Sequence, residues 1–208
     1  MRKIISSILL ISVFSFGFSG IDTPDDQVKT AATAQLQKAL QMIPVGQETS
    51  FGFSSRSEFS TASVDEVFHT ISLTQEFYQD ENVLDKNYIL LQSEWRVPVT
   101  VQGENRVLLT IFHDGNALNV VDIGGVGLAK ELQQISSGQI DTQKYILRIY
   151  PLAVDFAVFV PIGKTIADGN YYPMQSALMG ITGIKNSVMS QKEVLEIVKE
   201  KLKSTSKN

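Results

Sequence analysis

The chain has 208 residues, of which 43% are hydrophobic and 19% are charged, and its mean hydropathy is +0.04. These values are typical of one globular domain and exclude both a disordered tail and a membrane bundle. The sequence contains no cysteine, which excludes a disulfide framework, a thiolate nucleophile, a cysteine zinc site and a lipid-modified cysteine. We therefore expect the fold to depend on its hydrophobic core.

The first residues have the pattern of a secretory signal peptide. Met1-Arg2-Lys3 is a cationic start, and an apolar stretch follows from Ile4 to Phe18. A helix that spans a membrane needs about 20 apolar residues, so this stretch favours a cleaved signal. We expect cleavage after Ser19 and export to the periplasm or the exterior. An uncleaved N-terminal anchor is the alternative.

The charge of the mature chain argues against a nucleic-acid partner. Residues 1–19 hold two basic residues and no acidic one, so their removal leaves 16 basic and 22 acidic residues and a net charge of −6. Nucleic-acid binding needs a concentrated basic face. Basic residues are scattered here, except for a lysine run that complements the end of a predicted helix. We expect a protein or small-molecule partner, no nucleic acid, and no membrane after signal removal.

Apolar residues recur at helical spacing in three segments, which predicts helices at about 24–43, 126–137 and 190–203. The last helix begins with a capping box formed by Ser190 and Glu193. The tail at 204–208 should fray.

Alternating apolar and polar side chains predict an amphipathic strand from Tyr88 to Val101. Pro98 has no N–H for the ladder, so this strand, and residues 95–101 in particular, should lie at a sheet edge or carry a bulge. The pattern and the turns predict further strands at residues 106–112, 117–123, 145–150 and 154–160, and a sixth strand after the turn at Asp168-Gly169.

Two Asp-Gly pairs predict hairpin turns, because a type I′ turn needs positive φ at both central residues. The turn at Asp114-Gly115 should pair Phe112 with Ala117 and Ile111 with Leu118. The turn at Asp168-Gly169 should pair Val160 with Ala177.

This order of elements predicts an α+β fold in a single domain over residues 20–203. We expect an antiparallel sheet of about five to seven strands with helices packed mainly on one face. Residues 47–87 should form an ordered loop with a short helix and at most one strand. In element order alone, the chain resembles cystatin-like domains, a group that includes inhibitors and propeptides, and this implies an inhibitor- or propeptide-like role.

Several motif-like features lack the residues that their chemistry needs. Gly124-Gly125-Val126-Gly127 precedes a helix, but a dinucleotide fingerprint would need glycine where Lys130 stands. A tight turn is the favoured interpretation. His69 and His113 are the only histidines, which excludes a three-histidine zinc site, and no HExxH spacing occurs. We therefore expect no metal and no cofactor.

Asp155 is unusual because it interrupts a strongly apolar strand. A carboxylate in such a place should be paired or have a raised pKa. A structural ion pair with Arg148 or Lys144, or a solvent-facing position, is the alternative to a functional role.

Aromatic residues alternate with small polar residues and an arginine between residues 51 and 59. Such a segment can form an adaptable recognition loop, so Phe51, Phe53, Arg56 and Phe59 are the candidate binding residues. Anchoring of a long loop in the core is the competing interpretation.

The sequence thus predicts an exported, non-catalytic binding or regulatory domain. The alternative is a cofactor-independent hydrolase that uses a carboxylate pair. Catalysis would require at least two members of one set in a single pocket: Glu94, His113, Asp122 and Asp155.

Overall fold

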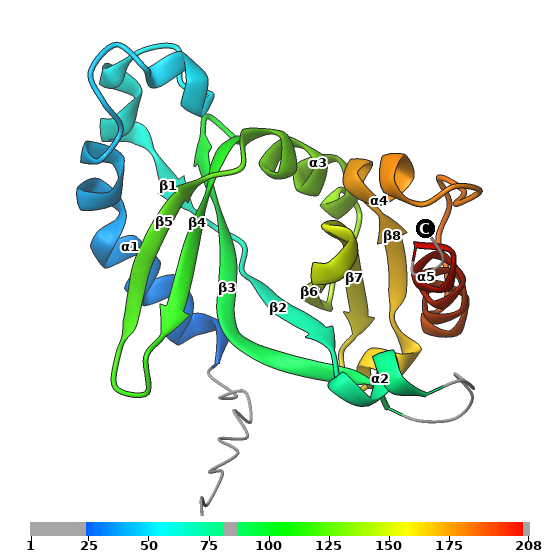
Figure 1. The fold of residues 1–208 in the computed structure, drawn as a ribbon. Helices are drawn as coiled ribbons and strands as arrows, with labels where there is room; N and C mark the ends of the chain where they lie inside the picture. Colours follow the sequence, from blue (N-terminus) through cyan, green and yellow to red (C-terminus); the bar gives the residue numbers. More distant parts are fainter. Residues whose placement is uncertain (1–23, 81–86, 206–208) are drawn as a thin grey trace, which may run out of the picture.

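The computed structural model describes residues 24–80 and 87–205 and consists of one mixed sheet with helices around it (Figure 1). The strand order is β5-β4-β3-β2-β6-β7-β8, and β1 pairs with β3, which makes eight strands. The strands are β1 (Ser63–Val64), β2 (Phe68–Leu73), β3 (Ile89–Val101), β4 (Glu104–His113), β5 (Leu118–Gly124), β6 (Thr142–Ile149), β7 (Val154–Pro161) and β8 (Asn170–Pro173).

The three predicted helices are present as α1 (Asp25–Gln41), α3 (Val126–Ser136) and α5 (Gln191–Thr205). Two short helices, α2 (Gln75–Gln79) and α4 (Gln175–Gly180), lie between them. The capping box of α5 forms, because Ser190 N–H donates to the Glu193 carboxylate at 2.7 Å. The last helix includes Ser204 and Thr205, which we expected to fray. The predicted signal at 1–19 and residues 206–208 lie outside the described residues.

The sheet is mixed, so the prediction of an antiparallel sheet with five to seven strands was wrong in detail. β2 pairs in parallel with β6, with His69 opposite Tyr145 and Ser72 opposite Arg148. All other strand pairs are antiparallel. The described part of the segment at 47–87 holds two strands, β1 and β2, where at most one was expected. All six side chains of β2 are buried, and a parallel partner so far along the chain leaves no local sequence signal.

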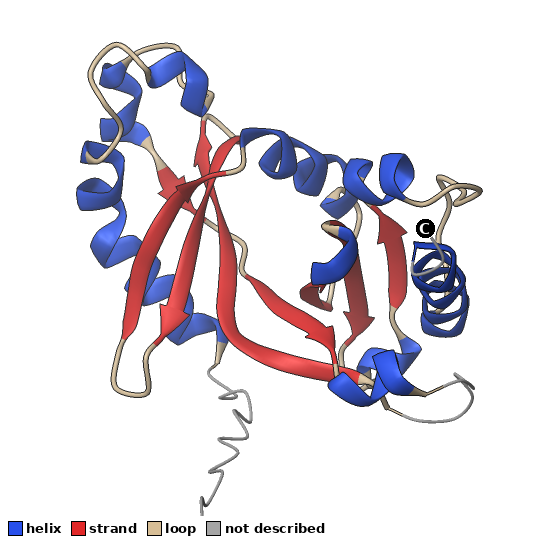
Figure 2. Cartoon of the chain, in the orientation of Figure 1, coloured by secondary structure: helices blue, strands red, loops and turns tan. Residues whose placement is uncertain are grey.

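Helices pack on both faces of the sheet rather than mainly on one. The side chains of α1 join the apolar face of β3 and β4, and those of α5 join the same face farther along the sheet. The opposite face holds α3, which runs along the top of the view in Figure 2, between the upper ends of β4 and β5 and the helix α4. Its apolar cluster contains Phe68, Leu108, Ala129, Leu132, Ile146, Ala157, Phe159 and Met174.

The first hairpin has a longer turn than predicted. Phe112 pairs with Asn119 and Ile111 with Val120, and a register shift follows at Thr110. The cause lies in Asp114, whose side chain accepts hydrogen bonds from the N–H groups of Asn116 and Ala117, both at 2.9 Å. This Asx-type turn replaces a two-residue turn and moves the partner strand along the ladder.

The second predicted hairpin register is also wrong. Gly169 has extended backbone with φ −73°, and Thr165 and Asp168 form a capping box instead of a type I′ turn. β8 therefore pairs Phe159 with Asn170, and Ala177 lies in α4 rather than in a strand.

The strand that contains Pro98 is an interior strand, not an edge. β3 lies between β4 on one side and β1 with β2 on the other. On the second side the ladder is interrupted between the Val99–Val64 pair and the Arg96–Phe68 pair, and Pro98 stands opposite this interruption. The missing N–H is thus tolerated without an edge, and the register of β3 against β4 shifts nearby, between Val99 and Thr100.

Candidate functional site

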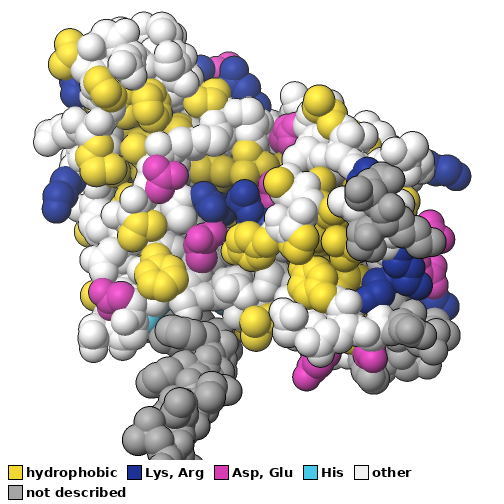
Figure 3. Space-filling model, viewed as in Figure 1, with side chains coloured by type: hydrophobic (Ala, Val, Ile, Leu, Met, Phe, Trp, Pro, Cys, Tyr) yellow, Lys and Arg dark blue, Asp and Glu magenta, His cyan; other side chains and the backbone are white. Residues whose placement is uncertain are grey.

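The face that carries α3 is apolar beneath the helix and polar beyond it. Residues directly opposite each other in a ladder project to the same face, and Arg96 lies opposite Thr110 while Arg148 lies opposite both Ser72 and Asp155. We call the resulting set the polar stripe. Its members are Thr70, Ser72, Gln92, Glu94, Arg96, Thr110, Arg148 and Asp155. Figure 3 shows basic and acidic side chains side by side in the middle of this face.

One half of the polar stripe is internally paired. Arg96 forms an ion pair with Glu94 at 2.9 Å and donates a hydrogen bond to the Thr110 hydroxyl. The Thr70 hydroxyl donates to the same Glu94 carboxylate at 3.4 Å. The charges of Arg96 and Glu94 are thus compensated within the protein, and the contacts fix the positions of these side chains.

Asp155 in the other half is buried and incompletely satisfied. The residue is 8% exposed, and its Oδ1 atom is buried without a hydrogen-bond partner among the described residues. Its N–H donates to the Ser176 hydroxyl of α4 at 2.9 Å. Burial raises the pKa of the Asp155 carboxyl, and this effect outweighs the attraction of Arg148 and Arg96. The sequence analysis predicted that the Asp155 carboxylate is either paired or has a raised pKa, and the second alternative is the one found.

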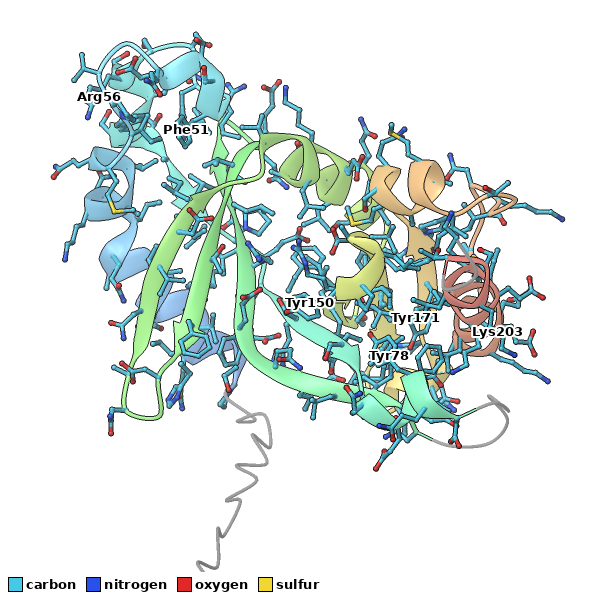
Figure 4. All side chains as sticks on the ribbon, viewed as in Figure 1. Phe51, Arg56, Tyr78, Tyr150, Tyr171 and Lys203 are labelled. Atoms are coloured by element: carbon cyan, nitrogen blue, oxygen red, sulfur yellow. The ribbon has the colours of Figure 1, made fainter. Side chains whose placement is uncertain are left out.

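Arg148 is partly buried, yet it forms no hydrogen bond and no ion pair within the described part of the chain. Its guanidinium lies 5.7 Å from the centre of the Tyr150 ring. Tyr150 belongs to the short turn η3 (Tyr150–Leu152), which joins β6 to β7, and Figure 4 shows it between β3 and β7. A structural ion pair between Arg148 and Asp155 is therefore not formed.

Tyr150 completes the site as an aromatic side chain at its mouth. The residue is 54% exposed, and Glu94 and Asp155 both act on its phenol electrostatically. Partial burial, followed by Glu94, raises the pKa of the Tyr150 phenol, so its hydroxyl stays protonated and available as a donor. The site thus combines an available cation, an unsatisfied carboxylate oxygen and a phenol.

The segment predicted as a recognition loop is packed against the α1 side of the sheet. Phe53 and Phe59 are buried and contact each other edge to face with ring centres 4.9 Å apart. Arg56 pairs with Glu48 at 2.9 Å, donates to the Ile43 carbonyl and lies over the Phe59 ring. Phe51 is half-buried against the same cluster. The packing agrees with the core interpretation, and a binding role for these residues stays a prediction.

The other singled-out residues do not form one site. His113 lies at the end of β4, where its Nδ1 accepts from Gly115 N–H at 3.0 Å. Asp122 lies opposite Thr110 and so on the same face as the polar stripe, but it is exposed on β5 and separated from Asp155 on β7 by β4, β3, β2 and β6. Asp155 and Glu94 do share the polar stripe and repel each other. No three His, Asp or Glu side chains between residues 24–80 and 87–205 lie close enough to hold a metal ion.

The glycine cluster before α3 is a tight turn. Gly125 has φ +71°, and a side chain there would contact Leu108. This geometry is the conformation that glycine adopts without strain, as predicted.

Sequence reasoning found Asp155 but missed the role of Arg148 as an unpaired neighbour and missed Tyr150 entirely. The alternation of Glu94 and Arg96 against apolar β3 residues did indicate a polar face. The position of each arginine side chain decides which one stays unpaired. Neither the hydrophobic periodicity nor the composition of the sequence contains that information.

Comparison with known proteins gives no further guide to function. No family model, no curated protein sequence and no solved structure matches the chain. Among the described residues, no helix has both the length and the apolar character needed to cross a bilayer.

Proposed function

We propose that the chain is an exported, non-catalytic binding module whose ligand docks on the polar stripe. The observation that carries the proposal is that two neighbours in the β6–β7 ladder do not pair with each other. Asp155 Oδ1 is buried without a hydrogen-bond partner among the described residues, and the partly buried Arg148 guanidinium forms no ion pair there. An unsatisfied buried polar atom destabilises a protein by about 1–3 kcal/mol. A fold that needed only stability would place the two groups in contact.

The other arginines support this interpretation. Arg56, Arg96 and Arg106 all form ion pairs with N–O distances of 2.8–3.4 Å. Arg148 is the exception among the arginines in the described ranges 24–80 and 87–205. An arginine kept free beside an aromatic ring is a common feature of binding surfaces, where arginine and tyrosine are enriched.

Export is the second part of the proposal and depends on the signal pattern at 1–19. An inhibitor- or propeptide-like role would make the ligand a protein segment, while a small polar molecule is the other class that fits the stripe. Processing after Ser19 can be measured by mass spectrometry of the protein secreted from a bacterial host.

The binding proposal is tested by comparing stability and ligand capture in matched variants. Arg148→Ala and Asp155→Asn are measured singly and together by thermal unfolding and by native mass spectrometry against a panel of small charged metabolites and unstructured peptides. Lys38→Ala, on the exposed side of α1, is the control. We expect captured probes to be lost in the stripe variants and kept in the control.

A double-mutant cycle of Arg148→Ala and Asp155→Asn measures whether the two side chains stabilise each other, which would contradict the binding proposal. If Arg148 and Asp155 form a structural pair in solution, the single substitutions will each destabilise the protein and their coupling energy will exceed about 1 kcal/mol. That result, together with probe binding that is unaffected by the substitutions, would overturn the proposal.

A carboxylate-pair hydrolase is the second candidate, favoured by one observation. Asp155 has a raised pKa, as a general acid needs, and Glu94 on the same face is held by Arg96. Hydrolysis of model esters, peptides or glycosides that Asp155→Asn and Glu94→Gln both abolish would establish this candidate in place of the binding module.

A further inference from the structure

The unpaired groups of the polar stripe have opposite charges and adjacent positions. Arg148 and Asp155 are direct partners in the β6–β7 ladder, which places their Cβ atoms about 4.5–5.5 Å apart on one face. The neighbouring Arg96 and Glu94 neutralise each other. The available half of the site therefore carries one positive and one negative charge at close range.

We propose that this site binds a free α-amino acid, with the ligand carboxylate on the Arg148 guanidinium and the ligand ammonium on Asp155 Oδ1. The inference rests on the proposed binding function and names its ligand class. An α-amino acid carries both charges on one carbon atom, which matches two side chains that are neighbours across a ladder. A planar guanidinium can hold a carboxylate through two parallel hydrogen bonds.

Ligands with a single charge fit this site less well. A simple anion would satisfy Arg148 but leave Oδ1 of Asp155 unpaired and would face the repulsion of Asp155. A simple cation would satisfy Asp155 but face the repulsion of Arg148. Only a ligand with a donor and an acceptor group satisfies both side chains without adding net charge.

Tyr150 lies at the edge of the site. Its ring centre is 5.7 Å from the Arg148 guanidinium, and the residue is 54% exposed on the 3-10 helix η3. An aromatic ring beside Arg148 would contact the side chain of an amino acid whose carboxylate binds the guanidinium.

The ligand class is tested by titration calorimetry with the protein from residue 20 onward, after removal of the predicted signal. The probes are the proteinogenic L-amino acids, each compared with its N-acetyl derivative, which lacks the ammonium, and its amide, which lacks the carboxylate. We expect at least one amino acid to bind and both derivatives to bind at least about tenfold more weakly. Arg148→Ala should remove binding of the amino acid, and Arg148→Lys should restore part of it, because lysine keeps the charge but not the fork.

The pH dependence supplies an independent readout. The groups that face Asp155 are Glu94 and Arg96 from β3, Arg148 from β6, Tyr150 from η3 and Ser176 from α4. Since the ammonium requires an ionised Asp155, affinity should rise with pH through the raised pKa of that carboxyl and then level off. In Asp155→Asn the rise should disappear.

The failures of the two proposals can be distinguished. Equal binding of an amino acid and its N-acetyl derivative, with loss in Arg148→Ala, would overturn the amino-acid inference and leave the binding module intact. No binding of any amino acid, together with strong coupling between Arg148 and Asp155 in the double-mutant cycle, would overturn both.

Discussion

At the scale of single residues, Asp155 shows that the polar stripe is not optimised for stability. Folding buries its carboxyl and raises its pKa, so the folded state binds a proton more readily than the unfolded state does. By linkage, the stability then falls as pH rises from the ordinary carboxyl pKa through the raised value. A group that destabilises the protein near neutral pH is one whose presence calls for a functional explanation.

Asp155→Asn should therefore stabilise the protein near neutral pH. We expect a gain of about 1 kcal/mol, which corresponds to roughly 2–4 °C in Tm for a domain of this size. The gain should shrink at about pH 3, where the wild-type carboxyl is protonated in both states. Thermal unfolding across this pH range measures it, with the exposed Asp122→Asn as control. A lower Tm in Asp155→Asn at neutral pH would contradict the prediction.

Phe53 separates the core interpretation of residues 51–59 from the recognition interpretation. Its side chain is 1% exposed and packs on Phe59, so Phe53→Ala should destabilise the protein by about 3–5 kcal/mol. Phe51→Ala, at the half-buried edge of the same cluster, should cause a clearly smaller loss. Chemical denaturation checks both. A Phe53→Ala protein of unchanged stability would restore the recognition loop as the leading candidate site.

At the scale of elements, the two outer strands of the sheet are both covered. The Gln35 side chain of α1 donates to the Leu118 carbonyl at 2.9 Å and accepts from the Val120 N–H at 3.0 Å. At the other edge, Tyr171 of β8 exchanges two backbone hydrogen bonds with Met189, both at 2.9 Å. Two backbone groups on each edge strand, at Leu118 and Val120 of β5 and at Tyr171 of β8, are thus occupied and cannot pair with a foreign strand.

Gln35→Ala should expose the edge of β5. We expect the variant to self-associate on concentration, because outward N–H and carbonyl groups become available for strand pairing. Light scattering against concentration measures this. Gln37→Ala is the control on the same helix, since it loses a side-chain hydrogen bond to the Phe59 carbonyl but leaves the two Gln35 contacts with β5 in place. Equal behaviour of the two variants would contradict the role of Gln35.

Elements with a local signal were predicted well, and those set by distant contacts were not. The helical periods of α1, α3 and α5 gave their positions within a few residues. The predicted register of β5 was wrong because hydrogen bonds to the Asp114 carboxylate stabilise a longer turn. At the site, the apolar neighbours of Asp155 were visible in the sequence, whereas the separation of Arg148 from its partner was not.

At the scale of the whole molecule, the cluster beneath α3 joins the two halves of the sheet. It takes Phe68 and Leu108 from the N-terminal strands and Ile146 and Phe159 from the C-terminal strands. Since the parallel β2–β6 ladder joins the same two halves, the chain should unfold in one cooperative transition.

Leu132→Ala tests this coupling. Leu132 is fully buried on α3, and its truncation should destabilise the protein by about 2–5 kcal/mol. Calorimetry should still show a single transition, shifted to lower temperature, and hydrogen exchange should accelerate in β4 and β7 alike. Lys130→Ala, exposed on the same helix, should change neither. Two separate transitions in Leu132→Ala would show that the halves unfold independently.

The parallel pairing of β2 with β6 also has a consequence for the order of folding. During synthesis, which starts at the N-terminus, β2 is made long before residues 142–149. One edge of this strand, whose six side chains are all buried in the folded protein, therefore lacks its β6 partner until those residues are made. Such an intermediate is prone to wrong pairing.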